Sequence, residues 1–242
     1  MHLSTPATAI DPRAQAAADR KRLQRALNAS LAFVLLLTAM FAVQQVIDWQ
    51  WLAVAPHAWG GLVGVLVAPL LHGSPEHLGA NAVSLLLLGT LAGTVYPRAT
   101  LRALPLLWLG SGLAAWTLGE AGTRHLGASG LSHGLMFLVF VLGLLRRDRP
   151  AIAAAMIAFF LYGGMLLTVL PHEPGVSWQA HLGGALAGIL AALLFRHSDP
   201  PAPRKRYSWE LEADAPPPHD ADELRLPRPD DVPVLWRRDG DP

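Results

Sequence analysis

Residues 127–145 read GASGLSHGLMFLVFVLGLL, an apolar stretch that carries a serine, Ser129, near its start. A second apolar stretch, residues 178–195, carries His181 near its start. Hydroxyl and imidazole groups are costly in hydrocarbon unless they have partners, so polar groups in such segments suggest a function. A nucleophile and a base inside membrane-spanning sequence predict peptide-bond hydrolysis within a bilayer.

Apolar segments recur along the whole chain and set its fold class. Hydrophobic residues make up 52% of the 242 residues, which is more than a soluble domain of this length needs. Several runs are each close to the ~20 residues that a spanning helix requires. They comprise residues 28–47, 78–95, 101–118, 128–145, 151–170 and 178–195. We therefore predict an all-α membrane protein, a bundle of six transmembrane helices.

A shorter apolar piece, residues 59–71, does not enter this count. It is too short to span a bilayer easily. Its sequence contains Gly60, Gly61, Gly64 and Pro69. These residues favour an interfacial or re-entrant segment over a continuous spanning helix.

Basic residues beside the apolar runs predict the orientation. Arginines and lysines precede the first run, lie between the second and third and between the fourth and fifth, and follow the sixth. With six spans all of these segments share one side of the membrane, and only Arg124 falls on the other side. The positive-inside rule then places both termini in the cytoplasm, N-in and C-in.

Composition divides the chain into three parts. We expect residues 1–27 to form a cytoplasmic N-terminal arm, residues 28–196 the membrane domain and residues 197–242 a Pro-rich acidic cytoplasmic tail. The tail has too little apolar sequence to fold alone and is predicted to be disordered. The arm does not resemble a cleaved signal peptide, because the apolar run after it is long enough to span. The absence of cysteine excludes disulfides and thiol catalysis.

A polar cluster, HGSPEHLGAN, occupies residues 72–81 at the start of the second run. His77 and Asn81 are four residues apart, so both side chains project from one helical face. Their N–H groups are suitable donors to the oxyanion that forms when a hydroxyl attacks a carbonyl, and each such donor contributes roughly 3–4 kcal/mol. A capping and packing cluster at a helix start is the alternative interpretation.

Ser129 lies between two glycines, Gly127 and Gly130. Small residues there allow a tight turn, and a helix start adds positive potential beside a developing oxyanion. Packing of two helices is the other explanation for the small residues. The glycines within residues 183–188 offer a face on which the sixth run can approach the fourth closely. If these two helices touch there, His181 can take the proton of Ser129. No acidic residue occupies a matching position, so we predict a Ser–His dyad rather than a triad.

Together these motifs resemble the rhomboid family of intramembrane serine proteases. They are HxxxxHxxxN at the start of the second run, GxSG opening the fourth and AHxxGxxxG in the sixth. The resemblance covers residues 28–195. It implies that Ser129 is the nucleophile and His181 the general base. It also implies that His77, Asn81 and the backbone amide of Ser129 form the oxyanion hole.

By the same resemblance, Gly127, Ala128 and His133 belong to the substrate-binding surface. His133 stands where many relatives carry a tyrosine that stacks on the catalytic histidine; an imidazole can stack there too, or compete as a base. His72 matches a histidine that in the family orders the site rather than reacts. Residues 127–134 also look similar to the rhombosortase branch, which processes tagged C-termini of exported proteins.

The predicted function is an intramembrane serine endopeptidase that cleaves transmembrane substrates near the outer membrane face. The expected partners are transmembrane protein substrates and the lipid bilayer, with no nucleic acid, no cofactor and no metal. A zinc site from His72, His77 and His181 lacks the spacing that zinc motifs show. The compact six-span form suits a multi-pass protein of a bacterial inner membrane.

A non-catalytic rhomboid-like protein is the alternative, one that binds transmembrane segments for trafficking or quality control. Such relatives usually lack the serine or the histidine. A transporter or channel would show intramembrane charge or broken helices, whereas here only Glu120 lies close to a span. The sequence leaves the substrate, the cleavage site and the oligomeric state open.

Overall fold

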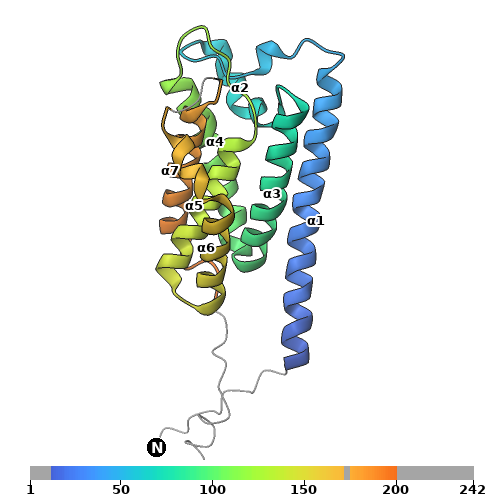
Figure 1. Ribbon diagram of the computed structural model, residues 1–242, viewed down its shortest axis with the longest axis vertical. Helices are drawn as coiled ribbons and strands as arrows, with labels where there is room; N and C mark the ends of the chain where they lie inside the picture. Colours follow the sequence, from blue (N-terminus) through green and yellow to red (C-terminus); the bar gives the residue numbers. More distant parts are fainter. Residues whose placement is uncertain (1–11, 172–174, 201–242) are drawn as a thin grey trace, which may run out of the picture. The chain divides into compact units, whose positions relative to one another are not determined.

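The computed structural model describes residues 12–171 and 175–200. This part of the chain is helical, and six of its helices are long and apolar enough to cross a membrane, as the sequence predicts. Figure 1 shows them as α1 (Pro12–Gln44), α3 (Pro75–Val95), α4 (Pro97–Leu118), α5 (Ser129–Arg146), α6 (Arg149–Tyr162) with the 3₁₀ helix η4 (Gly163–Val169), and α7 (Trp178–Phe195).

The first and fifth spans differ from their predicted bounds. α1 begins at Pro12 and so extends into the predicted N-terminal arm, where alanine, arginine, glutamine and leucine favour helix. The fifth span is α-helical only to Tyr162 and continues as η4, because the pair Gly163-Gly164 weakens an α-helix. The rest of the predicted arm, residues 1–11, and the predicted tail from residue 201 lie outside the described residues.

Short helices fill the connection between α1 and α3. They are η1 (Gln50–Leu52), η2 (Trp59–Gly61), α2 (Leu62–Val67) and η3 (Ala68–Leu70). The α-helical piece of residues 59–71 is only six residues long, so the prediction that this segment does not span is confirmed. The segment packs closely on its own loop, since a Cβ on Gly64 would collide with the backbone of Ala53 and Val54.

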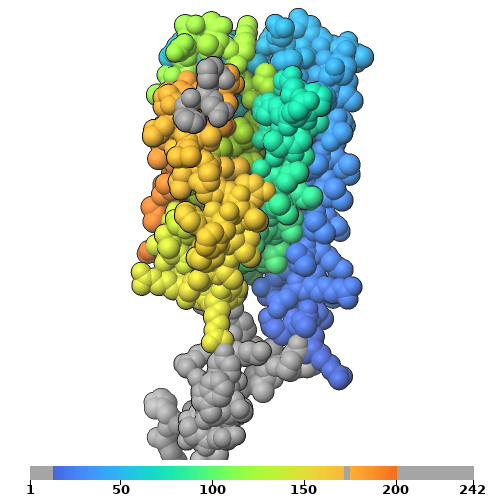
Figure 2. Space-filling model, viewed as in Figure 1, coloured from blue at the N-terminus to red at the C-terminus, as the bar shows by residue number. Residues whose placement is uncertain are grey.

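α5 is the most enclosed of the long helices. In the most apolar 18-residue window of each span, 61% of the residues are buried in α5 and 50% in α7, against 11% in α1. In Figure 2 the visible face is formed mainly by α1 (blue), α3 (teal) and α6 with η4 (gold), and little of α5 is seen. Polar groups on α5 are therefore shielded by protein from the hydrocarbon around the bundle.

Glycines bring α7 against two neighbouring helices. A Cβ on Gly184 would collide with the carbonyl oxygen of Gly130 in α5. Gly183 instead faces α4, where a Cβ would collide with the carbonyl oxygen of Gly110. The predicted glycine face of residues 183–188 is thus shared between α5 and α4, and backbone contact brings the first turns of α5 and α7 together.

Candidate active site

Ser129 is placed by the turn that precedes it, because it is the first residue of α5. This turn passes through Gly127, whose φ of 109° lies in the left-handed region that favours glycine. The N–H of Gly127 donates to the carbonyl oxygen of Ala68 in η3 at 2.9 Å. Because Ser129 is in the first turn of the helix, its backbone N–H has no intrahelical partner.

His181 meets Ser129 from α7. Oγ of Ser129 lies 2.7 Å from Nε2 of His181, and the imidazole is buried, with 6% of the residue exposed. Nδ1 of His181 lies 3.0 Å from the carbonyl oxygen of Thr168 in η4. Because a carbonyl oxygen only accepts, Nδ1 carries the hydrogen and Nε2 is left to accept the hydroxyl hydrogen of Ser129. The arrangement can therefore move a proton from hydroxyl to imidazole.

The third member of this chain of hydrogen bonds is a backbone group. Among the described residues no carboxylate is hydrogen-bonded to His181, in line with the absence of a matching acid in the sequence. The Thr168 carbonyl occupies the place that a carboxylate has in a triad and fixes the tautomer in the same way. Sequence analysis did not find Thr168, because a backbone carbonyl has no residue signature.

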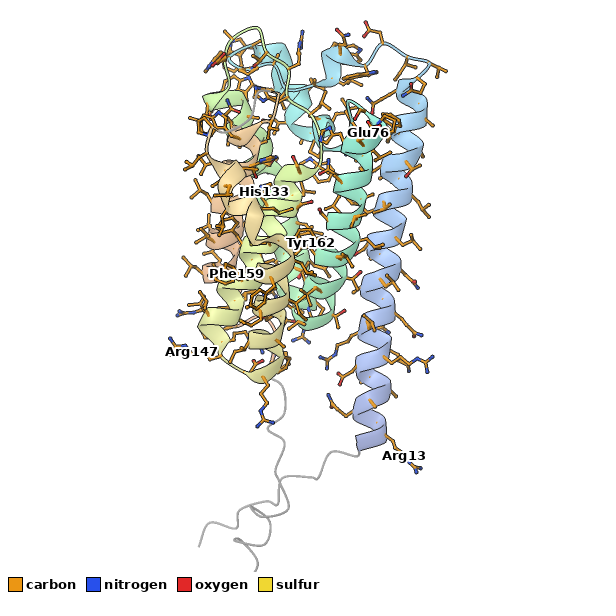
Figure 3. The ribbon with its side chains drawn as sticks, in the orientation of Figure 1. Arg13, Glu76, His133, Arg147, Phe159 and Tyr162 are labelled. Carbon is orange, nitrogen blue, oxygen red and sulfur yellow. The ribbon has the colours of Figure 1, made fainter. Side chains whose placement is uncertain are left out.

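His133 lies one helical turn after Ser129 and stacks on His181. The ring centroids are 3.9 Å apart and the planes are 13° from parallel. The stacking that the sequence predicts at this position is thus present in the structure. Figure 3 shows His133 within the bundle, toward the end that carries Glu76 and away from Arg13 and Arg147.

His77 and Asn81 approach Ser129 from α3. A Cβ placed on Gly127 would lie 2.6 Å from Nε2 of His77 and 3.6 Å from Nδ2 of Asn81, so both nitrogens face the turn before the serine. Nδ2 of Asn81 is buried and has no hydrogen-bond partner within residues 12–171 and 175–200. The N–H of His77 donates to Oγ of Ser74 at 3.1 Å, so the helix cap is present as well. Side-chain nitrogens of His77 and Asn81 thus lie against the turn that precedes Ser129, and the amide of Asn81 is available to donate.

His72 supports this cluster from the connection before α3. Only 1% of the residue is exposed, and among the described residues neither ring nitrogen has a hydrogen-bond partner. Its backbone is held by Gln44 of α1, which accepts from its N–H at 3.0 Å and donates to its carbonyl at 3.1 Å. Burial, with a smaller effect of His77, lowers the pKa of His72 to about 4. The ring is therefore neutral, and its edge contact with His77, at 5.1 Å between centroids, suits a structural role.

A second hydrogen-bonded group holds the start of α7, and sequence analysis did not single it out. Nδ1 of His125 lies 2.7 Å from Oγ of Ser177, the residue that caps α7, and Nε2 lies 2.9 Å from Oγ1 of Thr123. The backbone of His125 pairs with Val54 in an isolated bridge. Burial lowers the pKa of His125. This residue thus joins the loop before α2 to the start of the helix that carries His181.

Side chains that could ligate a metal are not clustered in the described part of the chain. Within residues 12–171 and 175–200, no three His, Asp or Glu side chains are grouped so that they could hold a metal ion. Of the three histidines considered for zinc, His181 uses both ring nitrogens in hydrogen bonds to Ser129 and Thr168. The described site is built from hydroxyl, imidazole, amide and backbone groups.

Comparison with known proteins identifies the family. Residues 60–198, more than half of the chain, match the rhomboid domain. An uncharacterized protein of Mycobacterium tuberculosis (Rv1337) is 40% identical over 149 residues, which cover 58% of this chain and 62% of the relative. An uncharacterized protein of Mycobacterium leprae (ML1171) is 37% identical over 163 residues, which cover 64% of this chain and 63% of the relative. The chain thus matches less than two thirds of the length of these relatives. The matched domain includes every helix that contributes a side chain to the site, and the protein belongs to the rhomboid family.

Proposed function

We propose that this protein is an intramembrane serine endopeptidase with Ser129 as nucleophile and His181 as general base. One observation carries the proposal: the 2.7 Å contact from Oγ of Ser129 to Nε2 of His181, with Nδ1 held by the Thr168 carbonyl. A serine hydroxyl is a weak nucleophile and needs an adjacent base in the correct tautomer. Membership of the rhomboid family, which includes serine intramembrane proteases, supports the same conclusion.

The proposed reaction has two halves. Oγ of Ser129 attacks the scissile carbonyl carbon while Nε2 of His181 takes the hydroxyl proton. Donors from His77, Asn81 and the Ser129 N–H stabilise the oxyanion of the tetrahedral intermediate. When the intermediate collapses, His181 gives its proton to the leaving amine and an acyl-enzyme remains. Water then gives a proton to His181 and attacks the acyl carbon. When this second tetrahedral intermediate collapses, His181 returns the proton to Oγ of Ser129 and the new carboxyl end is released.

The proposed substrates are transmembrane segments. A helical peptide bond keeps its carbonyl hydrogen-bonded, so the substrate must unwind locally before Ser129 can reach it. Residues that are small or break helices are therefore expected near the cleavage site. Water must reach the buried pair to complete hydrolysis, which requires a polar opening at the α2 end of the bundle.

We also propose the N-in, C-in orientation in a bacterial inner membrane. Basic residues stand at the start of α4, between α5 and α6 and after α7. Because successive spans run in opposite directions, these positions share the end of the bundle opposite Ser129. The positive-inside rule then places that end in the cytoplasm and the site toward the outer face. The mycobacterial relatives support a bacterial membrane.

A fluorophosphonate probe tests the proposal, because it reacts only with an activated serine. The purified protein is labelled in detergent and in lipid vesicles, as wild type, Ser129→Ala and His181→Ala. The control is Ser132→Ala, which removes another serine hydroxyl of α5, buried and without a hydrogen-bond partner. We expect labelling of wild type and Ser132→Ala only, with cleavage of a transmembrane reporter following the same order.

The outcomes separate the two classes of function. Loss of labelling in Ser129→Ala and His181→Ala establishes an activated serine. A folded wild type that neither labels nor cleaves in lipid would instead favour a rhomboid-like protein that binds transmembrane segments without cutting them. Full activity of either variant would exclude the proposed dyad.

A further inference from the structure

His133 and Thr168 form a hydrogen-bonded link beside the Ser–His pair. Nε2 of His133 lies 2.8 Å from Oγ1 of Thr168, and Nδ1 lies 2.7 Å from the carbonyl oxygen of Ser129. The carbonyl oxygen of the same threonine is 3.0 Å from Nδ1 of His181. One residue of η4 therefore contacts both stacked rings, one through its side chain and the other through its backbone.

The hydrogens on this link can be assigned from the partners. A carbonyl oxygen only accepts, so Nδ1 of His133 carries a hydrogen and donates to Ser129. In a neutral ring Nε2 is then an acceptor, and the Thr168 hydroxyl is the group that donates to it. This hydroxyl also lies 3.1 Å from the carbonyl oxygen of Met165, the longer of the two contacts. Its single hydrogen can serve only one of them, so a neutral His133 directs it away from Met165.

The charge on His133 bears on the proposed reaction. When Ser129 attacks, His181 becomes positively charged, and a second positive ring 3.9 Å away would oppose that proton transfer. A neutral ring instead offers its face to the cation. The other titratable ring that acts on His181 is His77 of α3. Among the described residues no carboxylate is hydrogen-bonded to His133 or His181.

We propose that Thr168 is a positioning residue with two separate actions, an inference that rests on the proposed function. Its carbonyl holds His181 in the tautomer that accepts the Ser129 proton. Its hydroxyl donates to His133 and thereby fixes η4 against α5, so that the carbonyl stays aligned. η4 needs such a tie, because it is a 3₁₀ helix that begins with Gly163-Gly164 and has weaker hydrogen-bond geometry than an α-helix.

Two substitutions of Thr168 isolate the hydroxyl. Thr168→Val has nearly the same shape and keeps the backbone carbonyl but removes the hydroxyl, whereas Thr168→Ser keeps both and is the matched control. We expect kcat for reporter cleavage to fall about tenfold in Thr168→Val with little change in KM, and to stay near wild type in Thr168→Ser. Equal activity of Thr168→Val and wild type would overturn the proposal.

A double-variant cycle tests whether the hydroxyl acts through His133. His133→Phe keeps an aromatic ring against His181 but removes both nitrogens. If the link is real, Thr168→Val in the His133→Phe background causes no further loss of kcat. Losses that multiply would show that the hydroxyl acts elsewhere, and the proposal would fail.

A measurement that needs no substrate separates this inference from the proposed function. In protein with ¹⁵N-labelled histidine, we expect the Nε2 resonance of His133 to shift in Thr168→Val but not in Thr168→Ser, with the His77 resonances unchanged. His133→Phe assigns the signal by removing it. If the Nε2 resonance of His133 does not shift in Thr168→Val, the link is refuted even if the protein is an active protease. If the resonance shifts but the wild-type protein is inactive, the link is retained and the protease proposal is rejected.

Discussion

Gly127 lies directly against the ring of His77: a side-chain carbon on Gly127 would be 2.6 Å from both Cε1 and Nε2 of that ring. The closeness requires a residue without a Cβ, and the φ of 109° favours glycine for a second, independent reason. Because Gly127 leads through Ala128 to Ser129, this contact sets the separation between a proposed oxyanion donor and the proposed nucleophile.

Gly127→Ala is therefore expected to reduce cleavage strongly. The control is Gly122→Ala, since Gly122 has a φ of 87° but a Cβ added there would meet no atom of the described residues within 4 Å. Both variants bear the cost of a left-handed alanine, about 1–2 kcal/mol. Only Gly127→Ala displaces His77, and it should lose about a hundredfold or more in kcat/KM. Equal losses in the two variants would show that backbone strain, not the His77 contact, matters.

Asn81→Ala should cause a partial loss of activity. Nδ2 of Asn81 has no partner in the structure, so removing it leaves no other hydrogen bond broken. If the amide donates to the oxyanion, the variant loses about 2–4 kcal/mol of transition-state stabilisation. Stability by thermal unfolding should change little by comparison. Unchanged kcat/KM would exclude Asn81 from the oxyanion hole.

Gly184→Ala is expected to separate α5 from α7. The new Cβ would collide with the carbonyl oxygen of Gly130, one residue after Ser129, so both stability and activity should fall, the former by about 1–3 kcal/mol. Gly79→Ala in α3 is the control, because in the described part of the chain a Cβ there meets no atom within 4 Å and alanine favours helix. Thermal unfolding and probe labelling measure both effects. A fully active, stable Gly184→Ala would contradict the backbone contact.

Stability should depend on pH through His72. Burial lowers its pKa to about 4 from an ordinary 6.5, so between these values the unfolded chain binds the proton and the folded chain does not. Stability from this group is complete above pH 6.5 and is lost as the pH falls toward 4, by up to about 1.4 kcal/mol per pH unit. Unfolding is followed between pH 5 and 8 in wild type, His72→Asn and, as an exposed control, His197→Asn. A pH slope unaltered by His72→Asn would refute this assignment.

The two hydrogen bonds of His125 can be removed one at a time. Asparagine places its amide near the position of Nδ1 and can keep the bond to Ser177, whereas glutamine reaches the position of Nε2 and can keep the bond to Thr123. Because Ser177 caps the helix that carries His181, His125→Asn should retain activity better than His125→Gln. Each lost bond should cost about 1 kcal/mol in unfolding free energy. The reverse order of activities would show that the Thr123 side of the link is the important one.

Much of this molecule follows from local sequence. The six spans were predictable because a run of about 20 apolar residues is costly in water and long enough to cross hydrocarbon, wherever its neighbours lie. Ser129, His181, His77 and Asn81 were predictable as candidates because polar residues in such runs are rare and because their order resembles that of rhomboid motifs. The approach of α7 to α5 was indicated by the glycines of residues 183–188.

Other features depended on what lies opposite in space. The contact of the Thr168 carbonyl with His181 has no local signal, since a backbone group is present at every residue and only folding chooses its partner. The same holds for Gly183, which faces α4 rather than α5, and for the link from His125 to Ser177. Sequence alone determined which segments leave water and which groups can react, because burial and chemistry belong to the residues. The tertiary structure alone decided which nitrogen of His181 carries the hydrogen, because that depends on a contact between chain segments that the sequence does not place together.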